Sequence, residues 1–461
     1  MLSVAAIVAA TVPQVVAWQA QVPARRSFVP PPIDEDALSQ PVPPQFPRGT
    51  TMSSVAIGSV SGPVGPSIPL LDVTISVGGL GQERFLFQEV GTATPRPLLV
   101  VFHRSNTSYY DGLLNTDYFV QARQRGWYCV APFGGSQLHY SSITSQLKTE
   151  AAFEWIDARY PIDRTRIYAV GFSMGGGAAM NYASRHLDPD GYMFAAVANI
   201  SGLVSHEHTY AVDSVVWPKF DQLFGNSLPG SAEPWKMQRS SLFSFDLNTF
   251  QTLPNSDLSR NLLHLSTRSY RASGDIPYLI TQNDLLHQHL LASGADPLRH
   301  TLTVVPTIAQ YHAWDIASES DVCSWLRLRT LQFPSSGNTL ADRDARFFHF
   351  EVEQDAAGAF TPFSWSVDTN TNSLVVTATS NLDRLLVHRV DAGLSDLLPL
   401  PVTTSDADGS PDDIVFLEWP ASPLAVWKDG APSMDWTHDA ITGELVLVGT
   451  SPGPHAWTIF P

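Results

Sequence analysis

The segment RIYAVGFSMGGG, residues 166–177, carries the strongest fold signal in the chain. An apolar run ends at Ser173, and a stretch of small residues typical of a closely packed helix start follows it. Gly171 and Gly175 flank the serine in the pattern Gly-x-Ser-x-Gly, which suits a tight turn from strand to helix because crowded neighbours leave no room for side chains. Such a turn exposes the serine hydroxyl above a sheet, and the helix directs its positive end at developing negative charge. The segment therefore predicts a nucleophilic Ser173.

Short apolar runs recur on both sides of this segment, at 98–103, 127–132, 194–202, 277–284 and 301–306. Nearly continuous apolar runs of this length are typical of parallel strands covered on both faces. Helical patterns separate them, at 116–126, 145–160, 174–186, 285–293 and 321–331. Strand alternating with helix predicts an α/β domain with a mostly parallel sheet, preceded by a hairpin over residues 71–90.

A serine at its own pKa is a poor nucleophile, so a histidine base must lie downstream. His312 follows the last apolar run and precedes the last helix, which is where a base is expected in the chain order Ser, Asp, His. We predict that Asp284, at the end of the predicted strand 277–284, holds the tautomer of His312. Asp275 precedes that predicted strand and would lie at the opposite sheet edge; it and Asp315 are the alternatives.

Two backbone N–H groups are expected to bind the oxyanion of the tetrahedral intermediate. One belongs to Met174, directly after the nucleophile, and the other to Arg104 or Ser105 in the loop after the run 98–103. The Arg104 guanidinium has two predicted roles. It pairs with a carboxylate such as Asp111 or Glu207 and holds the loop, or it faces the crevice and favours acidic substrates.

The stretch from about residue 72 to 331 resembles the α/β-hydrolase superfamily, and within it the secreted esterases related to polyhydroxyalkanoate depolymerases and feruloyl esterases. The likeness rests on LLVVFH (98–103), on AFEWIDARYPIDRTRIYAVGFSMGGG (152–177) and on YHAW (311–314). The family usually has glycine where Arg104 stands and often before the base, where Tyr311 stands here. The resemblance implies two-step acyl transfer through an acyl-enzyme, with no metal or organic cofactor.

The chain divides into four predicted parts: a signal peptide at 1–21, a proline-rich linker or arm at 22–50, the α/β-hydrolase domain at 51–333 with a lid-like insertion at about 203–272, and a β-sandwich-like domain at 343–461. The signal peptide is predicted from the apolar run Leu2 to Val16, which is short for a membrane span. A secreted or periplasmic protein is therefore expected. The insertion is predicted because so long a connection in a compact domain usually forms a lid or binding element.

Composition excludes some partners. The formal net charge is −17, from 27 basic and 44 acidic side chains, which argues against nucleic acid because phosphate binding needs a basic surface. No run after the N-terminus reaches the length of a membrane helix. His206-Glu207-His208 matches no metal-site spacing and is interpreted as a solvated loop. Cys129 and Cys323 are predicted to be buried free thiols, with a bridge between them as the alternative.

An esterase acting on a carboxylic ester, polymeric or not, is the leading functional hypothesis. Two others stay open. A serine peptidase of the prolyl-oligopeptidase kind shares the triad order, and a polymer-binding protein with a vestigial triad could use the C-terminal tryptophans as a stacking face.

Overall fold

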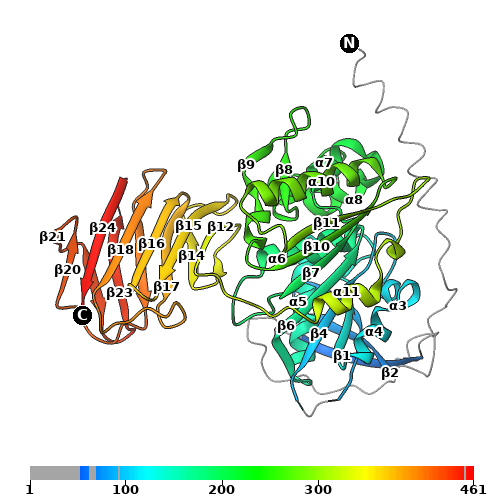
Figure 1. Cartoon of the computed structure of the whole chain (residues 1–461), viewed down its shortest axis with the longest axis horizontal. Helices are drawn as coiled ribbons and strands as arrows, with labels where there is room; N and C mark the ends of the chain where they lie inside the picture. The colour runs from blue at the N-terminus through cyan, green and yellow to red at the C-terminus, as the bar shows by residue number, and fades with distance from the viewer. Residues whose placement is uncertain (1–51, 62–68, 92–93, 451–452) are drawn as a thin grey trace. The chain divides into compact units, whose positions relative to one another are not determined.

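The computed structural model describes residues 52–61, 69–91, 94–450 and 453–461, so the predicted signal peptide and proline-rich segment lie outside the described residues. The chain forms two compact units (Figure 1). Among the described residues, the first unit comprises those up to Ala183, Tyr192–Leu253 and Leu265–Gln332; the second comprises Ser184–Gly191, Pro254–His264 and the residues from Phe333 on. The hydrolase domain predicted at 51–333 includes Ser184–Gly191 and Pro254–His264, but both segments group with the C-terminal strands.

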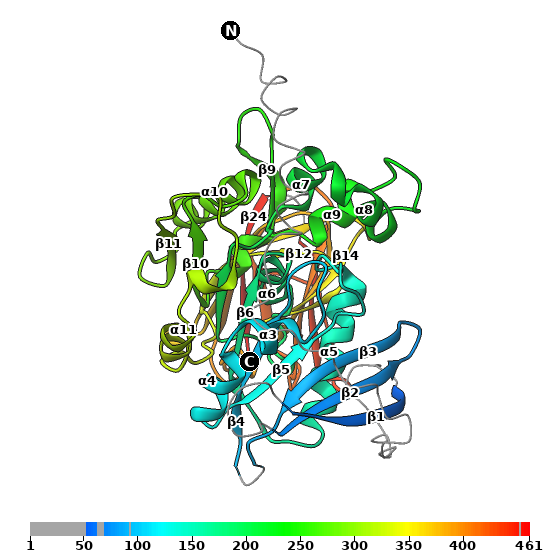
Figure 2. The same ribbon diagram turned by 90° about the vertical axis from the view of Figure 1, so that its right-hand side faces the viewer.

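The first unit is built on a nine-stranded sheet in the order β1-β2-β3-β5-β4-β6-β7-β10-β11. Its strands are β1 (Met52–Ser61), β2 (Pro69–Val77), β3 (Gly81–Gln88), β4 (Arg96–Phe102), β5 (Tyr128–Pro132), β6 (Ile162–Phe172), β7 (Ala196–Ile200), β10 (Ser266–Ala272) and β11 (His300–Val305). Strands β1 to β3 run antiparallel, β3 is antiparallel to β5, and every pairing from β5 to β11 is parallel. Figure 2 shows β1–β3 and β10–β11 at opposite ends of this sheet. The predicted hairpin and mostly parallel sheet are confirmed.

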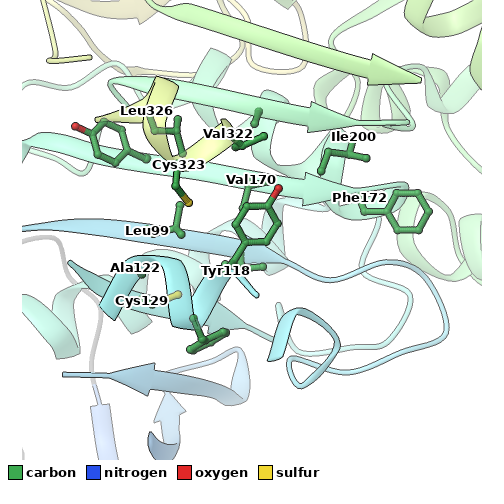
Figure 3. Close-up of a cluster of buried hydrophobic side chains, with 14 of the residues drawn as sticks. Leu99, Tyr118, Ala122, Cys129, Val170, Phe172, Ile200, Val322, Cys323 and Leu326 are labelled. Atoms are coloured by element: carbon green, nitrogen blue, oxygen red, sulfur yellow. The ribbon is translucent and has the colours of Figure 1, made fainter. Parts of the chain in front are cut away.

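Helices cover both faces of this sheet. On one face α4 (Tyr118–Gln124) and α11 (Glu319–Leu326) bury Tyr118, Ala122, Val322 and Cys323 against alternate residues of the strands, such as Leu99 and Val170 (Figure 3). Cys129 of β5 lies in the same cluster, and both cysteines are free and buried.

The other face is covered by α5 (Ile143–Asp157) and α6 (Met174–Arg185). Phe153 of α5 meets Tyr182 of α6 with ring centroids 5.7 Å apart, and Trp155 packs 5.5 Å from Phe85 of β3. No helix in the described ranges is long and apolar enough to cross a membrane.

The run 277–284 is a helix, and the strand prediction there is wrong. Pro277 opens α10 (Pro277–Ala292), where proline is tolerated because the first helical N–H has no partner. Leu279, Leu286 and Leu290 are buried at helical spacing. The strand of this region is β10, whose sequence STRSYRA is interrupted by two arginines and therefore lacks an apolar run, although it lies between β7 and β11.

The predicted insertion is mostly helical and has its own core. It contains α7 (His206–Val212), α8 (Trp217–Phe224), α9 (Pro234–Arg239) and the two-stranded sheet of β8 (Phe243–Phe245) and β9 (Thr252–Asp257). Phe220 and Phe224 of α8 pack in one cluster with Tyr140 and with Met174, the first residue of α6. The insertion thus covers the start of the helix that follows Ser173.

The second unit is all-β. One sheet has the order β12-β15-β16-β18-β24-β20-β21 and the other β13-β14-β17-β19-β23-β22. The strands are β12 (Ser336–Ala341), β13 (Ala345–Phe347), β14 (Phe350–Gln354), β15 (Thr361–Asp368), β16 (Ser373–Thr379), β17 (Leu382–His388), β18 (Leu400–Asp406), β19 (Asp412–Leu417), β20 (Ala425–Lys428), β21 (Ala431–Pro432), β22 (Trp436–Asp439), β23 (Glu444–Thr450) and β24 (Gly453–Phe460). Phe350 of one sheet meets Phe363 and Trp365 of the other at 6.1 and 4.9 Å, so the sheets pack face to face.

Polar contacts explain why the two short segments belong to this second unit. The Arg185 guanidinium contacts the Asp342 carboxylate, with Nε 3.1 Å from Oδ2, and both side chains are 1% exposed. Asn261 pairs with the backbone of β12: its amide donates to the carbonyl of Leu340 at 2.9 Å, and its oxygen accepts the Leu340 N–H at 2.9 Å. Because the partners in these pairs are far apart in the sequence, no local pattern predicts that the two segments belong to the second unit.

Candidate active site

Ser173 sits on a sharp turn between β6 and α6, as predicted, with a φ of +58°. A side chain at Gly171 would place its Cβ 2.0 Å from the carbonyl oxygen of Gly175, and one at Gly175 would lie 2.3 Å from that of Phe102. The turn is held by the Ser173 N–H, which donates to Ile200 at 2.9 Å, and by the Ser173 carbonyl, which accepts from Leu203 at 3.0 Å. A positive φ at a non-glycine residue costs about 1–3 kcal/mol and persists only where the surroundings impose it.

His312 pairs with Asp275. Its Nδ1 lies 2.7 Å from Oδ1 of Asp275, and both residues are buried. The same oxygen accepts the Ile276 N–H at 2.7 Å, and the Ser201 hydroxyl donates to the other oxygen. With Nδ1–H donating to the carboxylate, Nε2 is the ring nitrogen left to act as the base. The His312 ring packs 4.4 Å from the ring of Phe172, the residue before Ser173, which places the pair beside the turn.

The prediction that Asp284 holds His312 is wrong. Asp284 lies on α10, where its two oxygens accept from Nε and Nη2 of Arg271 at 2.7 Å each. The error follows from the misassigned strand: because 277–292 is helical, the loop after β10 contains Asp275 and not Asp284. The remaining alternative, Asp315, accepts from the Tyr311 hydroxyl at 2.6 Å. Two features of the sequence indicate the helix: the proline at 277 and the helical spacing of the leucines after it.

Arg104 is bound by Asp111 through its backbone and its side chain. The Arg104 N–H donates to Oδ2 at 3.2 Å, and the guanidinium Nε lies 3.4 Å from Oδ1. The pairing predicted for a loop-holding role is therefore present, whereas Glu207 accepts from Gln238. The Arg104 N–H points to Asp111, so its prediction as an oxyanion donor is wrong; Ser105 and Met174 stay predicted donors.

Two buried side chains missed by the sequence analysis position the loops around the turn. His103, at the end of β4, has Nε2 at 3.0 Å from the carbonyl oxygen of Phe133 and Nδ1 at 2.8 Å from that of Arg104, and burial lowers its pKa. Glu83 of β3 accepts the N–H groups of Phe133 and Gly134 at 2.8 and 2.9 Å, and burial raises its pKa to about 7. Together they tie the loop after β4 to the loop after β5.

The segment His206–His208 is not a solvated loop. It begins helix α7, with His206 and His208 buried and the His206 ring Nδ1 2.9 Å from the Ser241 hydroxyl. Burial lowers the pKa of His206 to about 3. Among the described residues, no three His, Cys, Asp or Glu side chains gather in a way that could hold a metal ion.

One family model and several solved structures are similar to part of this chain. The model of the Esterase family matches residues 96–250, about a third of the chain, which includes the turn at Ser173. The match shows that this part of the chain is similar to the Esterase family.

Solved structures with a similar fold include a ferulic acid esterase (16% identity, TM-score 0.39, covering 56% of this chain and 96% of that one). They also include an S-formylglutathione hydrolase from Agrobacterium tumefaciens (14%, 0.43, 59% and 99%) and an acetyl xylan esterase from Paenibacillus sp. R4 (14%, 0.42, 60% and 88%). No curated protein matches the chain.

Proposed function

We propose that this protein hydrolyses carboxylic esters by acyl transfer through Ser173. The observation that carries the proposal is the buried Asp275–His312 pair, whose imidazole packs on Phe172 directly before a serine held at positive φ. A serine, a base and a carboxylate that orients the base are the three roles that serine hydrolases require.

In the proposed mechanism, Nε2 of His312 takes the proton of the Ser173 hydroxyl as the oxygen attacks the ester carbonyl. Asp275 stabilises the imidazolium that forms, because its carboxylate already accepts from Nδ1. The Met174 and Ser105 N–H groups bind the oxyanion. The alcohol leaves with the proton from His312, and water activated by the same ring then releases the acid from the acyl-enzyme.

The test compares a short p-nitrophenyl ester with the matching p-nitroanilide, using the wild type and Ser173→Ala. The proposal predicts ester hydrolysis that disappears in the variant, with little or no anilide cleavage. Anilide cleavage at a comparable rate would favour a peptidase, and equal ester hydrolysis by both proteins would refute Ser173 as the nucleophile.

We also propose that the protein is exported, on the strength of the apolar run from Leu2 to Val16. N-terminal sequencing of the protein purified from its own cells tests this. A mature chain that begins near residue 22 supports export, and an intact N-terminus on a cell-internal protein contradicts it.

A further inference from the structure

Asp111 is a buried carboxylate that contacts both loops bordering the Ser173 turn. It begins the short helix α3 (Asp111–Asn115), and its side chain is fully buried. One of its partners is the loop after β4, through the N–H and the guanidinium of Arg104. The guanidinium supplies the positive charge that a buried carboxylate requires.

The second partner is the loop that carries His312. The indole Nε1–H of Trp314, two residues after the base, donates to Oδ2 of Asp111 at 3.0 Å across 203 residues of sequence. The Trp314 ring lies 5.4 Å from the ring of Phe172, which in turn contacts His312. One carboxylate oxygen thus binds the Arg104 N–H and the Trp314 indole together.

We infer that Asp111 is a positioning residue that fixes the oxyanion loop relative to the base loop. The inference rests on the proposed function, since it assigns the loop after β4 an oxyanion donor. Asp111 takes no part in proton transfer. Its carboxylate sets the separation of two loops that meet the same reacting carbonyl, and a displacement of about 1 Å at such a site costs about 100-fold in rate.

Two variants separate this role from a general effect on folding. Trp314→Phe removes the indole N–H together with part of the ring volume and keeps an aromatic ring against Phe172, and Asp111→Asn keeps an acceptor and removes the charge opposite Arg104. Asn115→Ala is the matched control, because its amide donates to Oδ1 of Asp111 at 2.8 Å from within the same short helix and touches neither loop through that bond.

The experiment measures kcat and KM for a neutral ester, with the melting temperature of each variant measured alongside. We expect Trp314→Phe and Asp111→Asn to lower kcat about 10- to 100-fold, with KM changed less than about threefold, and the double variant to be no worse than Asp111→Asn alone. Asn115→Ala should keep kcat within about twofold, even if it melts earlier.

Two outcomes overturn the inference: a kcat near wild type in Trp314→Phe, or losses in all three variants that follow their melting temperatures. Failure of the proposed function is a separate result, because the wild type would then show no hydrolysis that depends on Ser173.

Discussion

Replacing Glu83 with glutamine should change how stability depends on pH. Glu83 is fully buried on β3, and its Oε1 accepts two N–H groups from the loop after β5. Its Oε2 makes no hydrogen bond to any described residue. Burial raises the pKa of Glu83 from 4.5 to about 7, against the smaller opposing effects of those N–H groups and the Lys148 ammonium.

The direction in which stability changes with pH depends on whether Glu83 binds its proton more tightly in the folded or in the unfolded protein. The folded protein holds the proton up to about pH 7, whereas the unfolded chain releases it near 4.5. The stability that this group contributes is therefore complete below pH 4.5 and is lost as the pH rises through 7. The difference in pKa corresponds to about 3 kcal/mol.

Urea unfolding of the wild type and Glu83→Gln at several pH values between 4.5 and 8 measures this. Glutamine keeps an acceptor for the loop N–H groups and does not titrate, so the free energy of unfolding of the wild type relative to the variant should fall by about 3 kcal/mol across the range. Other titrating groups, such as His206, are present in both proteins and cancel. A difference that stays constant with pH would refute the reasoning.

Other substitutions test the site and the division into units. Ser173→Ala and His312→Ala should each remove nearly all ester hydrolysis, and the double variant should be no slower, because the residues act as one unit; additive losses in kcat would contradict this. Arg104→Gly should weaken hydrolysis of neutral and anionic esters alike, since its guanidinium is bound by Asp111, and a loss confined to anionic esters would show substrate recognition instead. Ending the chain at Gln332 should give a poorly soluble protein, because Ser184–Gly191 and Pro254–His264 lose the strands with which they group, including the partners of Arg185 and Asn261; a soluble product with wild-type melting would refute this reasoning.

The parts of the fold that were predictable are those with a local cause. Gly171 and Gly175 are needed because carbonyl oxygens crowd them, so the pattern around Ser173 could be recognised in sequence. The parallel strands followed from apolar runs buried on both faces. β10 was missed because it contains Arg268 and Arg271: the first stacks its guanidinium on Trp325 at 4.8 Å, and the second pairs with Asp284.

The wrong prediction of Asp284 as the carboxylate of the triad follows from the same missed strand. A segment with tyrosine, isoleucine and threonine has strand propensity, but Pro277 and tertiary packing make it a helix. The loop after β10 therefore contains Asp275. Hydrogen bonds between distant loops could not be predicted from the sequence, because Asp111 and Trp314 come into contact only in the folded chain. The sequence shows that Arg104 stands where the family usually has glycine, but it leaves both Asp111 and Glu207 as candidate partners for the guanidinium.

The most direct test of the proposed triad compares Asp275→Asn with Asp284→Asn in kcat for a p-nitrophenyl ester. Both substitutions replace a carboxylate with a neutral amide of the same size. Of the two carboxylates, Asp275 contacts His312, whereas Asp284 contacts Arg271. The proposed triad predicts that Asp275→Asn lowers kcat by about 10³- to 10⁴-fold, because the amide no longer stabilises the required tautomer and imidazolium. Asp284→Asn should stay within about twofold of the wild type, since its loss affects a partly exposed ion pair. A large loss in Asp284→Asn together with near-normal activity in Asp275→Asn would contradict the proposed triad.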